Sequence, residues 1–129
     1  MPEFGMRKTL DAPFEEALAR VPEALKAEGF GVLTEIDVQQ TLKNKLGVDF
    51  RKYRILGACN PPFAHQALQA ELEVGLLLPC NVIVYEGDDR RTVVAAVDPM
   101  ATLAATDDRL RPIAEAVRDR LRRALDTLG

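Results

Sequence analysis

The stretch that decides the fold is residues 53–68, Tyr53-Arg54-Ile55-Leu56-Gly57-Ala58-Cys59-Asn60-Pro61-Pro62-Phe63-Ala64-His65-Gln66-Ala67-Leu68. Its first half continues an apolar run from residue 52 that predicts a strand buried on at least one face, in which Gly57 permits a close backbone approach. Asn60 and the two prolines signal a helix start, because an asparagine oxygen can accept a bond from an early amide and proline has no amide to leave unpaired. A strand that leads directly into a helix of residues 61–71 is therefore expected.

Before this stretch the chain predicts a strand followed by a long helix. Residues 6–10 are compatible with a strand, and Asp11 is placed to cap the helix after it. We expect that helix to bend at Pro22, which lacks an amide, and to end at Gly29, a natural left-handed cap.

A second strand, residues 30–36, then leads into a short helix. Asp37 offers the cap of this helix and Gly47 closes it. Its apolar residues recur at the i, i+4, i+8 spacing of one helix face: Val38, Leu42 and Leu46.

After the central stretch the sequence indicates a hairpin and a final helix. Residues 76–78 should enter a strand that continues over 81–86, and a polar turn leads into a strand of residues 92–97. Asp98-Pro99 stops that strand, and we expect a loop as far as Thr106 or Asp107. The last helix carries a long apolar stripe: Leu110, Ile113, Val117, Leu121, Ala124 and Leu128.

These elements predict an α+β domain, with helices packed on one face of a mainly antiparallel sheet of about five strands. Residues 1–5 have the character of an expression scar, and residues 6–129 are expected to form a single domain. We predict two long helices behind the sheet and two short inserted ones.

Composition excludes several classes of function. The net charge of −3 argues against nucleic acid as a partner, and no apolar run approaches the roughly 20 residues of a membrane span. The start lacks a secretory signal, so we expect a cytoplasmic protein with free thiols. A serine nucleophile is excluded because the chain has no serine, and one histidine cannot build a three-histidine zinc site. We expect no cofactor.

The candidate site is defined by the two cysteines, Cys59 and Cys80, which end one strand and begin another. They have three interpretations: small buried hydrophobic residues, a redox or thiol-reactive pair, or an open metal or haem-iron site that also uses His65. Of the two asparagines that follow the cysteines, Asn60 is explained as a helix cap, whereas Asn81 either bonds a neighbouring loop or orients a ligand. The predicted ligand or thiol site is lined by Cys59, Asn60, Phe63, His65, Cys80 and Asn81.

Two segments, residues 53–68 and Gly75-Leu76-Leu77-Leu78-Pro79-Cys80-Asn81-Val82, resemble the domain-of-unknown-function family 302, as does the upstream Glu35-Ile36-Asp37-Val38. The resemblance implies a fold similar to that of the TATA-binding protein and a homodimer, and it implies no settled activity. We therefore expect a cytosolic, homodimeric, non-enzymatic domain that binds an unidentified small molecule. The alternatives are a thiol-dependent redox enzyme or sensor that uses Cys59 and Cys80, and a metal-binding protein.

Overall fold

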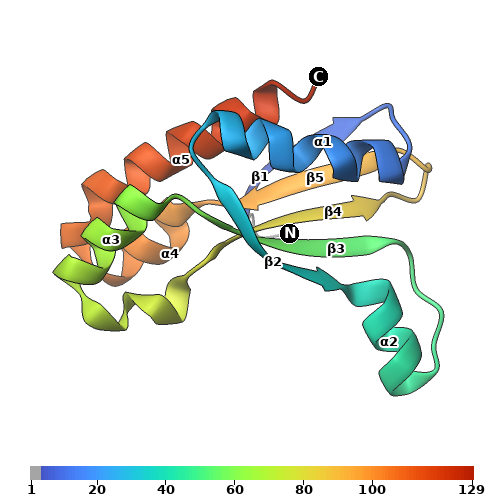
Figure 1. Cartoon of the computed structure of the whole chain (residues 1–129), viewed down its shortest axis with the longest axis horizontal. Helices are drawn as coiled ribbons and strands as arrows, with labels where there is room; N and C mark the ends of the chain where they lie inside the picture. Colours follow the sequence, from blue (N-terminus) through green and yellow to red (C-terminus); the bar gives the residue numbers. More distant parts are fainter. Residues whose placement is uncertain (1–3) are drawn as a thin grey trace.

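The computed structural model describes residues 4–129, so the first three residues of the predicted scar lie outside the described residues. These residues form one antiparallel sheet in the order β1-β5-β4-β3-β2. Its strands are β1 (Gly5–Leu10), β2 (Gly31–Asp37), β3 (Tyr53–Cys59), β4 (Cys80–Glu86) and β5 (Thr92–Val97). The two long helices, α1 (Phe14–Ala27) and α5 (Arg111–Asp126), lie on the same face of the curved sheet (Figure 1). The predicted α+β class is confirmed.

The central strands β4 and β5 bury every second side chain against α1 and α5, because neighbouring residues of a strand point to opposite faces. Leu56 pairs with Val82, and Val82 pairs with Ala96, so these three side chains form one row across β3, β4 and β5. All three are at most 3% exposed. The main core lies between this face of the sheet and the two helices.

Helix α1 ends as predicted but begins differently. Gly29 adopts a φ of +88°, which suits a residue without a Cβ, and the chain turns there into β2. Asp11 does not cap the helix, because Pro13 occupies the N-cap position and no side-chain cap bond forms there among the described residues. Pro22 lies inside the helix, which continues past it to Ala27.

A second core forms beyond the end of the sheet from short helical segments. They are α3 (Pro61–Ala70), η1 (Leu72–Leu77), α4 (Pro99–Thr106) and η2 (Asp108–Leu110), where η denotes a 3-10 helix. With α5 they bury a cluster of side chains: Ala67, Val74, Leu103, Ala104, Leu110 and Ala114.

Two predictions in this region were wrong. The predicted loop after Asp98 is α4, because the Asp98 carboxylate accepts a hydrogen bond from the Met100 amide at 2.9 Å while Pro99 takes the first helical position. The same Asp-Pro pair that stops a strand also starts a helix. The predicted strand entry at residues 76–78 is instead the end of η1 and its link to β4.

Helix α2 (Val38–Leu46) has the predicted bounds but not the expected packing. The Asp37 carboxylate accepts a bond from the Gln40 amide at 2.9 Å, and Gly47 ends the helix with a φ of +67°. None of the residues of α2 is buried by the described part of the chain, and Leu46 is 68% exposed. In Figure 1 the helix projects from the sheet below β2.

None of the helices in residues 4–129 combines the length and the apolar composition that a bilayer-spanning helix requires.

Candidate functional site

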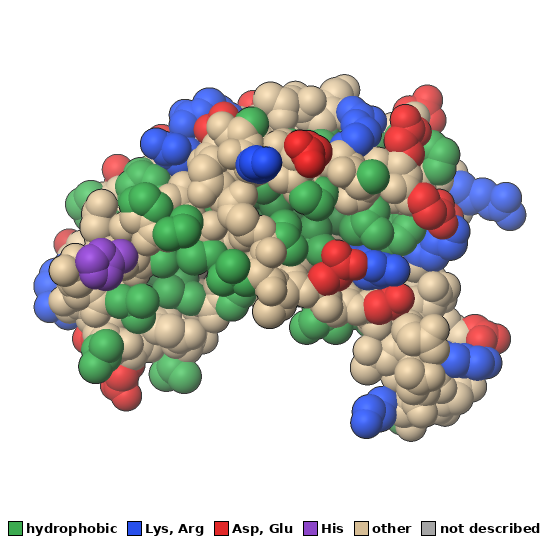
Figure 2. All heavy atoms as spheres, in the orientation of Figure 1, with side chains coloured by type: hydrophobic (Ala, Val, Ile, Leu, Met, Phe, Trp, Pro, Cys, Tyr) green, Lys and Arg blue, Asp and Glu red, His purple; other side chains and the backbone are tan. Residues whose placement is uncertain are grey.

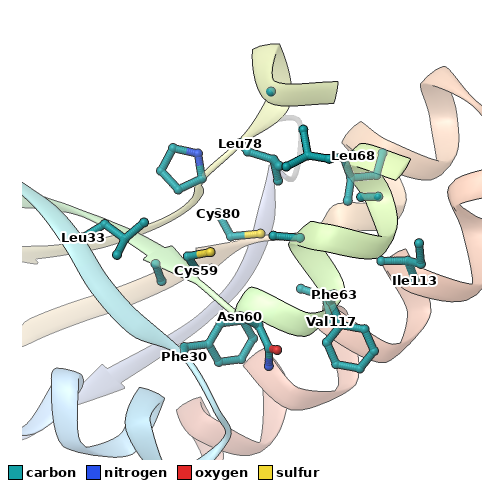
Figure 3. A pocket seen from close by; sticks show the side chains of 16 residues that line it. Phe30, Leu33, Cys59, Asn60, Phe63, Leu68, Leu78, Cys80, Ile113 and Val117 are labelled. Atoms are coloured by element: carbon teal, nitrogen blue, oxygen red, sulfur yellow. The ribbon is translucent and has the colours of Figure 1, made fainter. Parts of the chain in front are cut away.

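An apolar cavity of about 330 Å³ lies where β3 leads into α3 and β4 begins (Figure 3). Its walls come from β2, β3, β4, α3, the end of η1, α4 and α5, and so from both cores. The side chains at its centre include Phe30, Ala58, Cys59, Phe63, Cys80 and Val117. In residues 4–129, no lining residue carries a charge.

The strand register brings the two cysteines to this cavity. Ala58 pairs with Cys80 across β3 and β4, and Cys59 is the last residue of β3, where the chain leaves the sheet for α3, so both cysteines contribute to the lining. Cys80 is 8% exposed and Cys59 is half-buried, and both are free thiols. The two sulfurs point toward the same space in Figure 3.

Burial and the neighbouring Cys59 raise the pKa of the Cys80 thiol to about 11. Desolvation is the larger cause, because a thiolate is poorly stabilised among apolar side chains. Cys80 is therefore a protonated, weakly nucleophilic thiol at neutral pH.

The wall beside α3 is held by polar bonds on its outer side. Asn60 occupies the N-cap position of α3, but its side chain caps no amide among the described residues, so the predicted capping role was wrong. Its Nδ2 instead donates to the Glu28 carbonyl at 3.3 Å, and Arg120 donates to the same oxygen at 3.3 Å. The Arg120 guanidinium also lies 5.3 Å from the centre of the Phe63 ring, a cation–π contact that holds the ring in place.

The structure brings four of the six predicted site residues to one place: Cys59, Asn60, Phe63 and Cys80. His65 is exposed on the outer side of α3 and stands out at the surface in Figure 2. Asn81 is exposed on the opposite face of the sheet, because it follows Cys80 in a strand. No group of three or more His, Cys, Asp or Glu residues within residues 4–129 could hold a metal ion.

Sequence reasoning missed most of the apolar lining. Val117 and Ile113 belong to the stripe of α5 that was assigned to the core, and nothing in the helical spacing distinguishes cavity positions from packed ones. Leu33 reaches the cavity because a register shift between Val32 and Thr34 leaves it outside the β2–β3 pairing. Bulges of this kind commonly re-aim a side chain.

The fold and the site define an α+β domain with a helix-backed antiparallel sheet and an apolar cavity at the end of its β3–β4 pair. The chain belongs to the DUF302 family, because the model described as "Domain of unknown function DUF302" matches residues 6–128. The solved structure titled "Crystal structure of uncharacterized conserved protein DUF302 from Bacillus stearothermophilus" is similar, with 34% identity and a TM-score of 0.89 over 99% of this chain and 100% of that chain. The family resemblance predicted from the sequence is confirmed, and none of the curated proteins matches the chain.

Proposed function

We propose that the protein is a non-enzymatic domain that binds a small apolar molecule in the cavity between its two cores. The observation that carries the proposal is a space of about 330 Å³ with an uncharged, almost entirely hydrocarbon lining. Ligand pockets usually have volumes of about 300–1,000 Å³ and are lined mainly by apolar side chains. This cavity is at the lower end of that range, which suits a small ligand or one end of a longer one.

The lining also determines which part of a ligand it accepts. Around Phe30, Phe63 and Val117 an aliphatic or aromatic group loses its water contacts without losing hydrogen bonds, which is favourable. A charged or strongly polar group there would forfeit its hydration without a partner, at a cost of several kcal/mol, roughly 2–7 for a neutral polar group. The ligand is therefore uncharged over the buried portion.

A pair of substitutions at neighbouring positions of α3 tests the proposal. Ala64 lines the cavity, whereas His65 is exposed outside it. Protein freed of bound small molecules is titrated with the neutral fluorescent probe N-phenyl-1-naphthylamine. Ala64→Phe should abolish binding by occupying the space, and His65→Phe should leave the affinity within about twofold, since an exposed change leaves the cavity intact. Equal binding by both variants would show that the probe does not use the cavity.

The thiol-redox alternative is favoured by one observation, that Cys59 and Cys80 line the same cavity. The raised pKa of Cys80 weighs against it, since attack on a disulfide or peroxide requires a thiolate. Intact-protein mass measured after mild treatment with hydrogen peroxide tests it. In the ligand-binding proposal the reduced mass persists at neutral pH, and rapid loss of two hydrogens would support the redox pair.

We also propose that the protein acts as a homodimer in the cytoplasm, as the family resemblance implies. Such a dimer has a mass of about 28 kDa, twice the 14.2 kDa of the chain. The likeness to the TATA-binding protein that the resemblance implies carries no DNA-binding role, because function belongs to sites rather than folds and the chain has a net charge of −3.

A further inference from the structure

The face of the sheet that points away from α1 and α5 is apolar, and we call it the open face. In its central row Ile55 pairs with both Ile36 and Ile83, and Ile83 pairs with Ala95. In the next row Tyr53 pairs with Tyr85, whose rings stack with centroids 5.3 Å apart at an interplanar angle of 10°. Val93 and Val97 extend the same surface on β5.

This composition is unusual for a sheet face in contact with water. An antiparallel sheet with one solvated face normally alternates apolar and polar residues. Here the three central strands, β3, β4 and β5, are mainly apolar on both faces. The polar side chains of the open face that the structure describes are near its margins: Arg7, Thr9, Thr34 and Asn81. No helix among residues 4–129 covers this face (Figure 1). A continuous apolar surface of this kind marks an interaction site.

A second apolar surface lies on the segment formed by α2 and residues 47–50, which we call the arm. Its Leu46, Val48 and Phe50 are 68%, 44% and 43% exposed. The arm is nevertheless internally ordered, because Gln39 donates to the Phe50 carbonyl at 2.9 Å and Lys43 bonds Asp49 at 3.0 Å. The arm is therefore preformed, because these internal bonds do not depend on any contact that buries its apolar residues.

The open face and the arm adjoin each other. Ile36, at the edge of the open face, is 48% exposed and precedes the arm by one residue, Asp37. Figure 2 shows the outline of the molecule indented between the arm and the part formed by α3 and η1. A cavity of about 630 Å³ lies over the open face and is lined in part by Tyr53, Ile83 and Tyr85. The concave open face is therefore complementary in shape to a projecting segment such as the arm.

We propose that a second copy of this chain covers the open face, with the arm of each copy lying against the open face of the other. A two-fold symmetric dimer buries the open face and the arm of each copy together, because an isologous interface uses the same patches on both copies. The arrangement also fits the shape of the surfaces. Two concave faces that met directly would leave a gap at their centre, whereas the two arms would fill that gap.

The area that the arms can cover is enough for a weak specific dimer. Five strands about 4.8 Å apart, each with six residues at about 3.3 Å per residue, give an open face of roughly 24 Å by 20 Å. The arm offers a strip roughly 27 Å long and 10 Å wide, about 14 Å from the nine-residue α2 and about 13 Å from residues 47–50. Each arm and the equal area of open face beneath it bury about 540 Å² per copy, or about 1,100 Å² in total, at the lower end of specific interfaces.

Charge favours a second copy over a nucleic acid. The paired central residues of the open face are uncharged, Arg7 lies on an edge strand, and the chain as a whole has a net charge of −3. A phosphate backbone needs several basic side chains on the surface it contacts. An apolar surface that meets its own copy needs none.

This inference rests on the proposed homodimer. Sedimentation velocity tests separately whether the dimer forms and whether it forms through the open face and the arm. The experiment compares the wild type with Leu46→Glu on the arm and Ile83→Lys on the open face, at concentrations from about 1 to 100 μM, the range of many weak dimers. Ala19→Glu is the control, because Ala19 is exposed on α1, the helix that packs on the other face of the sheet, away from both surfaces. Circular dichroism establishes that each variant is folded.

We expect the wild type and Ala19→Glu to sediment as a species of about 28 kDa, twice the 14.2 kDa chain. Leu46→Glu and Ile83→Lys should dissociate at least tenfold more readily, because each places a charge in an apolar interface. A wild type that remains near 14.2 kDa throughout would refute the homodimer itself. A dimeric wild type whose folded Leu46→Glu and Ile83→Lys variants remain equally dimeric would refute only this surface. Probe binding in the cavity, measured separately, should be unchanged by Leu46→Glu.

Discussion

Filling the cavity should stabilise the fold while it removes ligand binding. Ala64 is half-buried on α3 and lines the cavity, and Ala64→Leu adds three carbon atoms. At about 0.8 kcal/mol for each buried carbon, the upper limit of the gain is about 2.4 kcal/mol. Cavity-filling substitutions commonly yield about 0.5–2 kcal/mol, so we expect about 1–2 kcal/mol in the free energy of unfolding. For a domain of this size the midpoint of thermal unfolding should rise by about 4–8 °C.

The assay is thermal and urea unfolding followed by circular dichroism, on protein freed of bound small molecules. Ala19→Leu is the control, because Ala19 is exposed on α1 and away from the cavity. Alanine and leucine have similar helix propensities, so Ala19→Leu should change the free energy of unfolding by less than about 0.5 kcal/mol. The affinity for N-phenyl-1-naphthylamine is measured on the same samples.

The reasoning is refuted if Ala64→Leu lowers the free energy of unfolding by more than about 1 kcal/mol while Ala19→Leu is neutral, the signature of an overpacked core. That result would mean that the space beside Ala64 is not open to added atoms. A stabilised Ala64→Leu variant that still binds the probe with wild-type affinity would place the ligand elsewhere.

Three further predictions concern the pKa of a thiol, a close backbone approach and a buried hydrogen bond. Because the pKa of Cys80 is raised from 9.0 to about 11, the stability gained by keeping this thiol protonated is fully present below pH 9 and lost as the pH rises toward 11. Iodoacetamide labelling, located by peptide mass, should therefore be slow at Cys80 until the pH exceeds about 10, and rapid labelling at pH 7 would contradict the buried environment. A Cβ on Gly57 would collide with Thr34 and approach the Pro79 ring to 2.8 Å, so Gly57→Ala should cost about 1–3 kcal/mol in urea unfolding. Gly31→Ala, which meets nothing within 4 Å, should be neutral or slightly stabilising, and equal effects would contradict the predicted clash. Thr92 is fully buried and its hydroxyl donates to the Ala12 carbonyl at 2.8 Å, so Thr92→Val should cost about 1–3 kcal/mol in thermal unfolding. Thr92→Ser keeps the donor and should lose only about 0.8 kcal/mol, so the reverse order of the two variants would show that the bond contributes little.

The elements that sequence predicted well are those with a local cause. The cap by Asp37, the left-handed Gly29 and Gly47, and the hairpin of β4 and β5 each follow from residues close together in the chain. The strand-to-helix junction at Asn60-Pro61 is also local, and its position was confirmed even though the Asn60 side chain bonds Glu28 instead of capping.

The errors arise where distant packing or a second use of the same residues decides the outcome. Asp98-Pro99 stops β5 and also caps α4, and the burial of Leu103 in the second core supports a helix there in addition to the local cap. The structure brings Cys80 close to Cys59, because Cys59 ends β3 and Cys80 begins the neighbouring strand β4. The separation of Asn81 from Cys80 follows from strand geometry, which assigns adjacent residues to opposite faces.

Most of the cavity lining had no signal in the sequence. Val117 has the same helical spacing as the packed residues of α5, and Leu33 is redirected by a bulge that the pattern of β2 does not indicate. A space between packed elements is a property of how the elements meet, and no residue type encodes it. His65 was chosen for its chemistry, whereas its position on α3 turns it to the outside.

The position of the cavity between two separately packed cores has a consequence for how the domain unfolds. Ile113 packs against both cores and lines the cavity, so it is one of the few side chains that join them. Helix α5 also joins the cores, because its Ala114 belongs to the helical core and its Leu121 to the sheet core. With the cavity empty, we expect α3, η1 and α4 to open locally more readily than the sheet. A bound apolar molecule touches Phe30 and Ala58 from the sheet core and Leu103 from the helical core. Such a molecule makes the opening of either core depend on the other, and the domain then unfolds as a single cooperative unit.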